Sequence, residues 1–490
     1  MRRSPPADLL AVAIYFVMGL AWIASMPGDA RLDRDEGFNL MKADLVARGH
    51  VLYREIWSDQ PALFTHLLVA WRWVAGESDS AARVLVLLVT CIGLASAGRL
   101  ATWFSGGRPL AGLLTVLLLI GARSYPKLSM AVMIGLPAIS IALLSVVLWR
   151  RSTPRRWGWA VAPLAGGLFA CSMQVKLFTF MMIPFALAVY VVAARQCGLS
   201  KRRAVIEIVL WAVALGAVTW LIGPWREPAW QQQLVTTHLR TGLPTDDTQA
   251  QALRSLFMRF IEDAPLMLAA GLSLWAGGWA VAARCLPAGI WLISSVLVLS
   301  QANPLWGHHR VMFSIPAAMI AGAALCGLID RWKARGRLAL LPVPDRLAVG
   351  AMVLAFVWGA GQVVGSLFTL GRGSDRHDPE LLARLKEIAR ERPAGWVISD
   401  DPHVVRAAGL LVPPEVAVLS LKRLQRDLTE DRFVEIIGHY RPPAIVLARH
   451  AYSDTFIARA TEGYQQVLSK KRGRVRCFVR LQTPATAPAP

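Results

Sequence analysis

The sequence predicts a mainly α-helical protein that crosses a membrane many times and carries a small soluble α/β domain on its C-terminal side. Hydrophobic residues make up 55% of the 490 residues. The mean hydropathy of +0.44 is too high for a soluble globular protein of this length. Several windows carry almost no charge over about twenty residues, which is enough to cross roughly 30 Å of hydrocarbon. From about residue 371 the composition becomes polar.

Residues 1–370 are expected to form the helical membrane domain. The number of spans is about eleven, or up to about thirteen if the shorter windows are divided differently. They are expected near 8–27, 82–104, 108–122, 127–149, 158–172, 176–195, 204–223, 264–284, 286–300, 311–329 and 346–370.

The net charge of +21 sets the expected orientation. Much of it lies on one side of the predicted topology, at Arg2 and Arg3 and in the loops 150–156, 195–203 and 331–337. The positive-inside rule makes that side cytoplasmic, so the N-terminus is expected in the cytoplasm of a multi-pass protein of the cell inner (plasma) membrane. The basic residues flank spans and do not alternate with aromatic residues, so nucleic acid is not an expected partner.

An odd number of spans places four features on the extracytoplasmic face. These are a first external loop at 28–81, the loop 224–263, the short turn 308–310 and the soluble domain. The apolar spans themselves are expected to be surrounded by membrane lipid.

The soluble α/β domain is expected at 371–482, because helical patterns alternate there with short apolar strands. The expected elements are helices at 379–392, 402–409, 429–440 and 453–462 and strands at 396–399, 444–447, 464–468 and 475–481. Asp400 and Asp401 end the first strand, which leaves a ligand site or a structural or docking role as interpretations. The Pro- and Ala-rich residues 483–490 are expected to be a disordered tail.

The most informative segment follows the first span, where Arg31-Leu-Asp-Arg-Asp-Glu-Gly-Phe38 places several charges beside hydrocarbon. A paired Asp35 and Glu36 is costly to keep near lipid, which indicates a working site at the bilayer surface. A plainer interpretation makes these residues a solvated turn, or a cap for a helix near 38–48.

The motifs have a recognisable order. A membrane helix precedes Asp35-Glu-Gly-Phe38, then come about twenty residues, Ser58-Asp-Gln-Pro-Ala-Leu63 and an apolar helix. This order resembles the first external loop of the GT-C superfamily of membrane glycosyltransferases, above all the protein O-mannosyltransferase-like branch and the lipid A aminoarabinose transferases. Ala165–Leu177 and His308–Pro316 are similar to later helices of that branch, so the resemblance extends over most of the membrane domain.

The resemblance implies an inverting transferase that takes a hexosyl or pentosyl group from a polyprenyl-phosphate carrier. The acceptor would be a glycan, a lipid or a protein on the extracytoplasmic face. Asp35 is the implied general base, with Glu36 beside it. A carboxylate can also stabilise an oxocarbenium-like transition state, and the departing lipid phosphate needs cationic partners.

Cationic residues are expected to gather around this loop, at the outer ends of spans. They are Arg83, Arg123, Lys127, Lys176, His308, His309 and Arg310. The planar fork of Arg310 makes it the better phosphate candidate. Lys176 either binds the phosphate or only extends to the interface, and His308 and His309 are either ligands or interface anchors. Trp57 could contact the sugar, and Asp59 could contact substrate or orient the turn at Pro61.

The chain also departs from the pattern of these relatives. Gln60-Pro61-Ala62 stands where many carry Lys-Pro-Pro, and residues 124–133 lack the second acidic residue that many have. Both departures are compatible with an altered mechanism or with an inactive member of the family that the sequence resembles. A lipid-linked-sugar flippase or polymerase and a non-catalytic membrane scaffold are therefore the alternative functions.

The six cysteines show no CxxC spacing, and no metal site is expected from them. No cofactor is expected, although a divalent ion could bind if Asp35 and Glu36 met a substrate phosphate.

Overall fold

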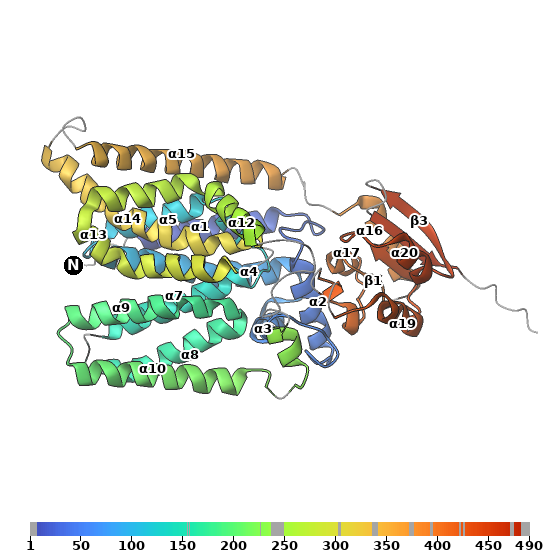
Figure 1. Cartoon of the computed structure of the whole chain (residues 1–490). Helices are drawn as coiled ribbons and strands as arrows, with labels where there is room; N and C mark the ends of the chain where they lie inside the picture. The colour runs from blue at the N-terminus through green and yellow to red at the C-terminus, as the bar shows by residue number, and fades with distance from the viewer. Residues whose placement is uncertain are drawn as a thin grey trace, which may run out of the picture.

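A computed structural model describes residues 7–153, 155, 157–225, 227–236, 249–301, 305–335, 342–371, 377–392, 395–420, 423–424, 427–470 and 475–481. Arg2, Arg3 and the expected tail 483–490 lie outside these residues. Figure 1 shows a long helical bundle with the N-terminus at one end and an α/β domain at the other. We call the end beside the α/β domain the domain-side end.

Apolar helices build the bundle. They are α1 (Ala7–Ser25), α4 (Asp79–Phe104), α5 (Pro109–Gly121), α7 (Gly135–Ser152), α8 (Gly158–Val175), η1 (Leu177–Met182) running into α9 (Ile183–Gln196), α10 (Lys201–Ile222), α13 (Ala264–Leu299), α14 (Val311–Arg335) and α15 (Val343–Gly371). Within the described residues, nine helices are long and apolar enough to cross a membrane. The mainly α-helical polytopic fold is therefore confirmed.

Helix α13 makes two passes, because the chain reverses at Gly278 (Figure 1). At its start, Asp263 accepts hydrogen bonds from the Arg123 backbone and from Ser314 at the domain-side end. Midway, the Ala276 carbonyl accepts from Arg331 near the other end of the bundle. Beyond Gly278, the Ser294 hydroxyl donates to the Met181 carbonyl near the domain-side end again.

The expected division of this region into 264–284 and 286–300 is therefore wrong in its boundary. The turn lies at Gly278, whose φ of +64° is a conformation that favours glycine. The short helix α5, of 13 residues, also leads from one end of the bundle towards the other, because Arg108 before it pairs with Asp330 of α14 and the Arg123 amide after it donates to Asp263. If α5 and the second arm of α13 are counted with these nine helices, the described chain passes along the bundle eleven times.

Short elements lie at the domain-side end. They are α2 (Glu36–Ala47), α3 (Leu63–Ala75), α6 (Tyr125–Leu128), η2 (Gln231–Thr236), α12 (Gln249–Glu262) and η3 (Gly307–Arg310). The span expected at 127–149 begins only at Gly135. The preceding segment leaves the helix because the Val132 amide donates to the Glu36 carboxylate and the Val132 carbonyl accepts from Asn39.

The C-terminal domain contains the predicted alternation of helices and strands. Its elements are α16 (Pro379–Glu391), β1 (Ile398–Ser399), α17 (Pro402–Ala407), η5 (Pro414–Val416), α19 (Glu430–Tyr440), β2 (Ala444–Leu447), α20 (Asp454–Ala460), β3 (Tyr464–Lys470) and β4 (Val475–Arg480). The sheet order is β1-β2-β4-β3, with β1 and β2 parallel and the other pairs antiparallel.

The core of this domain continues into the first loop. Met41 and Leu45 of α2, together with Leu52 and Ile56, belong to the same buried apolar cluster as the residues of β1, β2 and β4. Apolar burial contributes roughly 25 cal/mol per Å² of buried surface, so the loop and the domain stabilise each other. The α/β domain is consequently packed onto the first loop.

Helices α5 and α15 cross where two glycines face each other. A Cβ on Gly359 would lie 2.9 Å from the Gly121 Cα, and one on Gly121 would lie 2.8 Å from the Gly359 Cα. We expect Gly359→Ala to force the two helices apart and cost about 1–3 kcal/mol. The measurement is the melting temperature of the purified protein in detergent.

Gly361→Ala is the matched control, because a Cβ on Gly361 meets no atom within 4 Å among the described residues. It should leave the melting temperature unchanged or raise it slightly. Equal melting temperatures for both variants would contradict close packing at this crossing.

Candidate functional site

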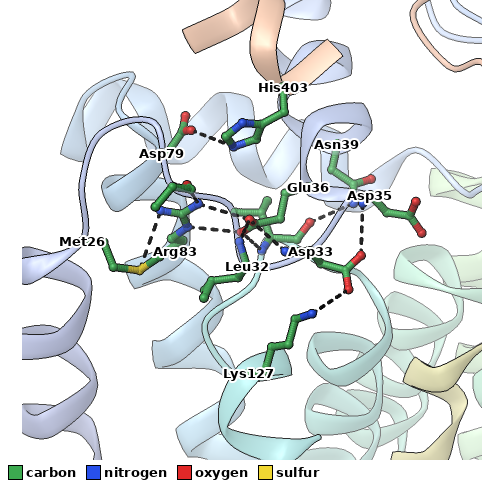
Figure 2. Close-up of polar contacts among 12 residues, drawn as sticks. Met26, Leu32, Asp33, Asp35, Glu36, Asn39, Asp79, Arg83, Lys127 and His403 are labelled. Carbon is green, nitrogen blue, oxygen red and sulfur yellow. Dashed lines mark hydrogen bonds and ion pairs between the residues drawn. The ribbon is translucent and has the colours of Figure 1, made fainter. Parts of the chain in front are cut away.

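The acidic segment of the first loop leads directly into α2, but its two neighbouring acids face different surroundings (Figure 2). Asp35 occupies the N-cap position, yet its side chain makes no capping hydrogen bond. The Asp35 side chain therefore does not cap α2, whereas Asp33 accepts from the Asp35 amide and Glu36 accepts from the Asp33 amide. The exposure of the two side chains also differs, at 36% for Asp35 and 0% for Glu36.

Glu36 forms a buried ion pair with Arg83 of α4 (Figure 2). Arg83 Nη2 lies 3.1 Å from Glu36 Oε2, and Arg83 Nε lies 3.2 Å from Oε1. The Leu32 and Val132 amides donate to the same carboxylate at 2.6 and 2.9 Å. Burial alone would raise the pKa of Glu36, but Arg83, the charge of His403 and the Val132 amide hold it below its ordinary value.

These contacts give Glu36 and Arg83 a structural function. Arg83 is also held by the Ala30 carbonyl, at 2.7 Å from Nη2. Both oxygens of Glu36 already accept hydrogen bonds from protein donors, which leaves little capacity for a substrate proton or a cation shared with Asp35.

Asp33 forms a second, more open acidic position (Figure 2). Its Oδ2 lies 3.5 Å from Lys127 Nζ of α6, and its Oδ1 accepts from the Asp35 amide at 3.1 Å. Burial raises the pKa of Asp33, and Lys127 opposes that shift. Asp33 thereby fixes the backbone at Asp35 and ties it to α6.

Asp35 is held from the C-terminal domain. Its Oδ1 lies 2.5 Å from Arg449 Nη2. Among the described residues, no group donates a hydrogen bond to the other oxygen, Oδ2. The side chain therefore presents one restrained and one available carboxylate oxygen.

Lys42 is a buried cation that sequence reasoning missed. It lies on α2, two turns after Asp35, and is only 3% exposed. Burial lowers the pKa of Lys42, while the charges of Asp59 and Asp35 oppose that shift. The spacing of seven residues between Asp35 and Lys42 places both on one helical face and was available in the sequence. Asp59 is half-buried and belongs to this charged group.

Trp57 is packed between the first loop and the C-terminal domain. Its ring is buried, forms a cluster with Phe38 and Val418, and lies 5.2 Å from the Arg423 guanidinium carbon. Sugar stacking on Trp57 stays a prediction, although the ring serves the domain contact in this structure.

The structure brings Lys176 together with the two histidines. Lys176 Nζ lies 3.5 Å from His308 Nε2 and 4.9 Å from the Phe178 ring centre. The His308 and His309 rings lie 4.5 Å apart, and His309 also contacts Phe178. This group joins the start of η1 to η3.

Arg310 does not belong to this open group. It is buried, and its Nη2 lies 2.5 Å from Glu262 Oε2. Glu262 is also paired with Arg259. The positive charge of Arg310 is therefore offset by a neighbouring carboxylate, which weakens its suitability as a free phosphate ligand.

The stretch of chain from α6 to the first residue of α7 lies beside two separate charged groups, the acidic loop and the group around Lys176. Lys127 faces Asp33, and Val132 binds Glu36. A Cβ on Gly135 would lie 3.9 Å from Lys176 Nζ. One short stretch of chain thus borders both the acidic loop and the Lys176 group.

Ion pairs dock the α/β domain on the first loop. Arg406 of α17 pairs with Asp44 at 2.7 Å and also contacts Asp79, while Arg31 pairs with Asp401 at 2.6 Å. Gly37 allows this approach, because a Cβ there would lie 2.6 Å from the His403 amide nitrogen. The glycine of the Asp-Glu-Gly motif therefore serves domain contact.

Two buried histidines lie in the same interface. His377 Nε2 is 2.6 Å from His403 Nδ1, and His403 Nε2 is 3.2 Å from Asp79 Oδ2. Burial lowers the pKa of His377 to about 4 and also lowers that of His403, although nearby carboxylates oppose both shifts. No set of three His, Cys, Asp or Glu side chains suited to a metal ion occurs within the described ranges.

Removal of one partner of the Glu36–Arg83 pair should be strongly destabilising. We expect Arg83→Met or Glu36→Gln each to cost about 3–5 kcal/mol, because the remaining group is left buried without its partner. The double variant should lose clearly less stability than the sum of the losses in the two single variants. Melting temperatures of the purified variants test this, and additive losses would contradict the coupling.

The histidine pair should make domain docking sensitive to acid. Below the ordinary histidine pKa of about 6.5, His377 binds a proton in the undocked state but not in the docked state. The docked state therefore loses stability as the pH falls, by up to about 1.4 kcal/mol per pH unit. The loss ends near pH 4, where His377 takes up a proton in the docked state as well. We expect His377→Gln to reduce the loss of melting temperature between pH 7.5 and 5. The exposed His439→Gln variant is the control, and equal losses in both would contradict this role.

Solved structures share the fold of the chain. ArnT from Cupriavidus metallidurans bound to undecaprenyl phosphate superposes with a TM-score of 0.61 at 16% identity, covering 96% of this chain and 98% of that one. The apo state of this ArnT superposes with a TM-score of 0.59 at 15% identity, with the same coverage of both chains. An Archaeoglobus fulgidus oligosaccharyltransferase tethered with an acceptor peptide superposes with a TM-score of 0.51 at 10% identity, covering 97% of this chain and 74% of that one.

No family model matches the sequence, and no curated protein matches it. The structural similarity extends over nearly the whole length of both this chain and ArnT, including the bundle and the α/β domain. The resemblance found in the sequence is thereby confirmed at the level of architecture. The chain therefore shares its fold with ArnT and with the oligosaccharyltransferase.

Proposed function

We propose that this protein is an inverting membrane glycosyltransferase that uses a polyprenyl-phosphate-linked sugar as donor. The observation that carries the proposal is the position of Asp35, a partly exposed carboxylate at the domain-side end of a bundle with the GT-C fold. One solved protein with this fold, ArnT, is bound to undecaprenyl phosphate, and another, the oligosaccharyltransferase, is tethered with an acceptor peptide. A lipid carrier and a separate acceptor are the partners we infer here.

Asp35 is the general base of the proposed reaction. An acceptor hydroxyl attacks the anomeric carbon while its proton passes to the Asp35 carboxylate. The bond between that carbon and the phosphate oxygen breaks, and its electron pair leaves with the lipid phosphate. Oδ2 of Asp35 suits this role, because the protein's own hydrogen bond is made to Oδ1.

Lys176 and His308 are the proposed contacts of the departing phosphate. Their polar ends lie 3.5 Å apart, beside the segment that also borders the acidic loop. Cations at this position would stabilise the charge that develops on the phosphate oxygen. His309 adds a polar group beside His308, whereas Arg310 would first have to leave Glu262.

Glu36 receives a different role from the one the resemblance implied. Its pairing with Arg83 makes it a positioning residue for the loop that carries Asp35. Asp59 and Trp57 are retained as proposed substrate contacts at the edge of this loop.

The reaction is proposed for the extracytoplasmic face of the inner membrane. The basic connections lie at the end of the bundle opposite the α/β domain, which the positive-inside rule makes cytoplasmic. The acceptor would then be a glycan, a lipid or a protein outside the cytoplasm, and the α/β domain would face it.

Asp35→Asn tests the proposed function directly. Purified protein in liposomes would receive a panel of radiolabelled polyprenyl-phosphate sugars with membrane extracts as acceptor source. We expect transfer from one donor by the wild type and a loss of at least about 100-fold in Asp35→Asn, because the amide cannot take up the proton.

Asp431→Asn is the control, since this exposed carboxylate lies in α19 and pairs only with Arg459 among the described residues. It should retain wild-type transfer. Undiminished transfer by folded Asp35→Asn would contradict the assignment of the base, and no transfer from any donor by the wild type would favour the flippase or scaffold alternatives.

A further inference from the structure

We propose that Arg449 of the α/β domain is a positioning residue for Asp35, so that the C-terminal domain completes the active site. This inference rests on the proposed function, in which Asp35 is the general base. It assigns to the domain a part in the reaction beyond docking.

Arg449 is restrained by three contacts with the start of α2. Its Nη2 lies 2.5 Å from Asp35 Oδ1, and its Nη1 donates to the Arg34 carbonyl at 3.3 Å. The guanidinium carbon also lies 4.5 Å from the centre of the Phe38 ring. A planar guanidinium can satisfy all three contacts at once, which fixes its orientation and that of the carboxylate.

The turn that carries Arg449 is built around a buried carboxylate. Asp400, at the end of β1, accepts hydrogen bonds from the backbone amides of Ala448, Arg449 and His450 at 2.7, 3.0 and 2.9 Å. The Tyr452 hydroxyl donates to the same side chain at 3.3 Å. Asp400 therefore fixes the backbone from which Arg449 reaches the membrane domain.

The domain as a whole is fixed by contacts that do not involve Asp35. Arg406 binds Asp44 and Asp79, Arg31 binds Asp401, and α2 shares its apolar core with the sheet. Because the domain is already in place, ordering Arg449 costs only the rotamer entropy of its own side chain. Arg449 can act as a fixed support.

The geometry restrains one oxygen of Asp35 and leaves the other available. A reacting carboxylate must approach the acceptor hydroxyl within hydrogen-bond distance in a defined direction, and a misplacement of about 1 Å can reduce the rate by roughly 100-fold. Loss of Arg449 should therefore affect the chemical step. It should change the binding of the donor little, since the proposed phosphate contacts, Lys176 and His308, belong to the membrane bundle and are held there by each other.

The test compares Arg449→Gln, Arg449→Lys and Arg406→Gln in full-length protein, with the labelled polyprenyl-phosphate sugar that supports wild-type transfer. We expect Arg449→Gln to lower kcat about 10–100-fold with KM for the donor within about threefold of wild type. Arg449→Lys keeps the charge but lacks the planar fork, so its kcat should lie between those of the wild type and Arg449→Gln.

Arg406→Gln is the matched control, because it removes an arginine from the same interface without contact to Asp35. It should lower the melting temperature without the fall in kcat. Wild-type kcat in Arg449→Gln, or an equal fall in kcat in Arg406→Gln, would overturn the positioning role.

Two further outcomes are also decisive. If Arg449→Gln does not fold, a kcat for Arg449→Lys several-fold below wild type at an unchanged KM supports the inference, and a wild-type kcat overturns it. If the wild type transfers sugar and Asp35→Asn does not, a failure at Arg449 concerns this inference alone. If the wild type transfers nothing, or folded Asp35→Asn transfers normally, the proposed function fails and the inference falls with it.

Discussion

The buried ion pair between Glu36 and Arg83 is the constraint on which the domain-side end depends. Two charges removed from water are stable only when their geometry is good and their remaining hydrogen-bonding groups are satisfied. Here the Leu32 and Val132 amides and the Ala30 carbonyl meet that requirement. The pair thereby ties the first loop to α4 and to the segment before α7, and it sets the direction in which α2 leaves the bundle.

With α2 fixed in this way, its two ends serve different purposes. Its start carries Asp35, which is partly exposed and bound through one carboxylate oxygen by Arg449. Farther along, Met41 and Leu45 enter the core of the α/β domain, and Asp44 binds Arg406. One helix of 12 residues therefore connects the membrane bundle, the proposed reaction and the C-terminal domain.

Much of the architecture could be predicted from the sequence because it follows from patterns within single segments. Apolar windows gave the passes of the bundle, and alternating helical and apolar stretches gave the α/β domain. The pattern of apolar windows did not locate the turn at Gly278, which depends on the backbone conformation of one glycine. It failed likewise before α7, where the Val132 amide binds a carboxylate 96 positions away.

The site was predictable only in part, for the same reason. The motif drew attention to Asp35 and Glu36 together, but their separation into a partly exposed and a buried group depends on Arg83 and on the fold. Lys42 could have been found from its spacing to Asp35, whereas Arg449, 414 positions from Asp35, offers no local pattern. Topology placed Lys176 and His308 at the same end, and tertiary structure decided that they meet.

The shared core of the first loop and the α/β domain also constrains how this protein can change over evolutionary time. Asp44 and Arg406 are 362 positions apart, yet they form part of one packed unit together with Met41 and the sheet. A substitution on one side of this unit alters the volume or charge available on the other, so tolerated replacements must occur as matched sets. The C-terminal domain cannot be exchanged for that of a distant relative unless the first loop is inherited with it.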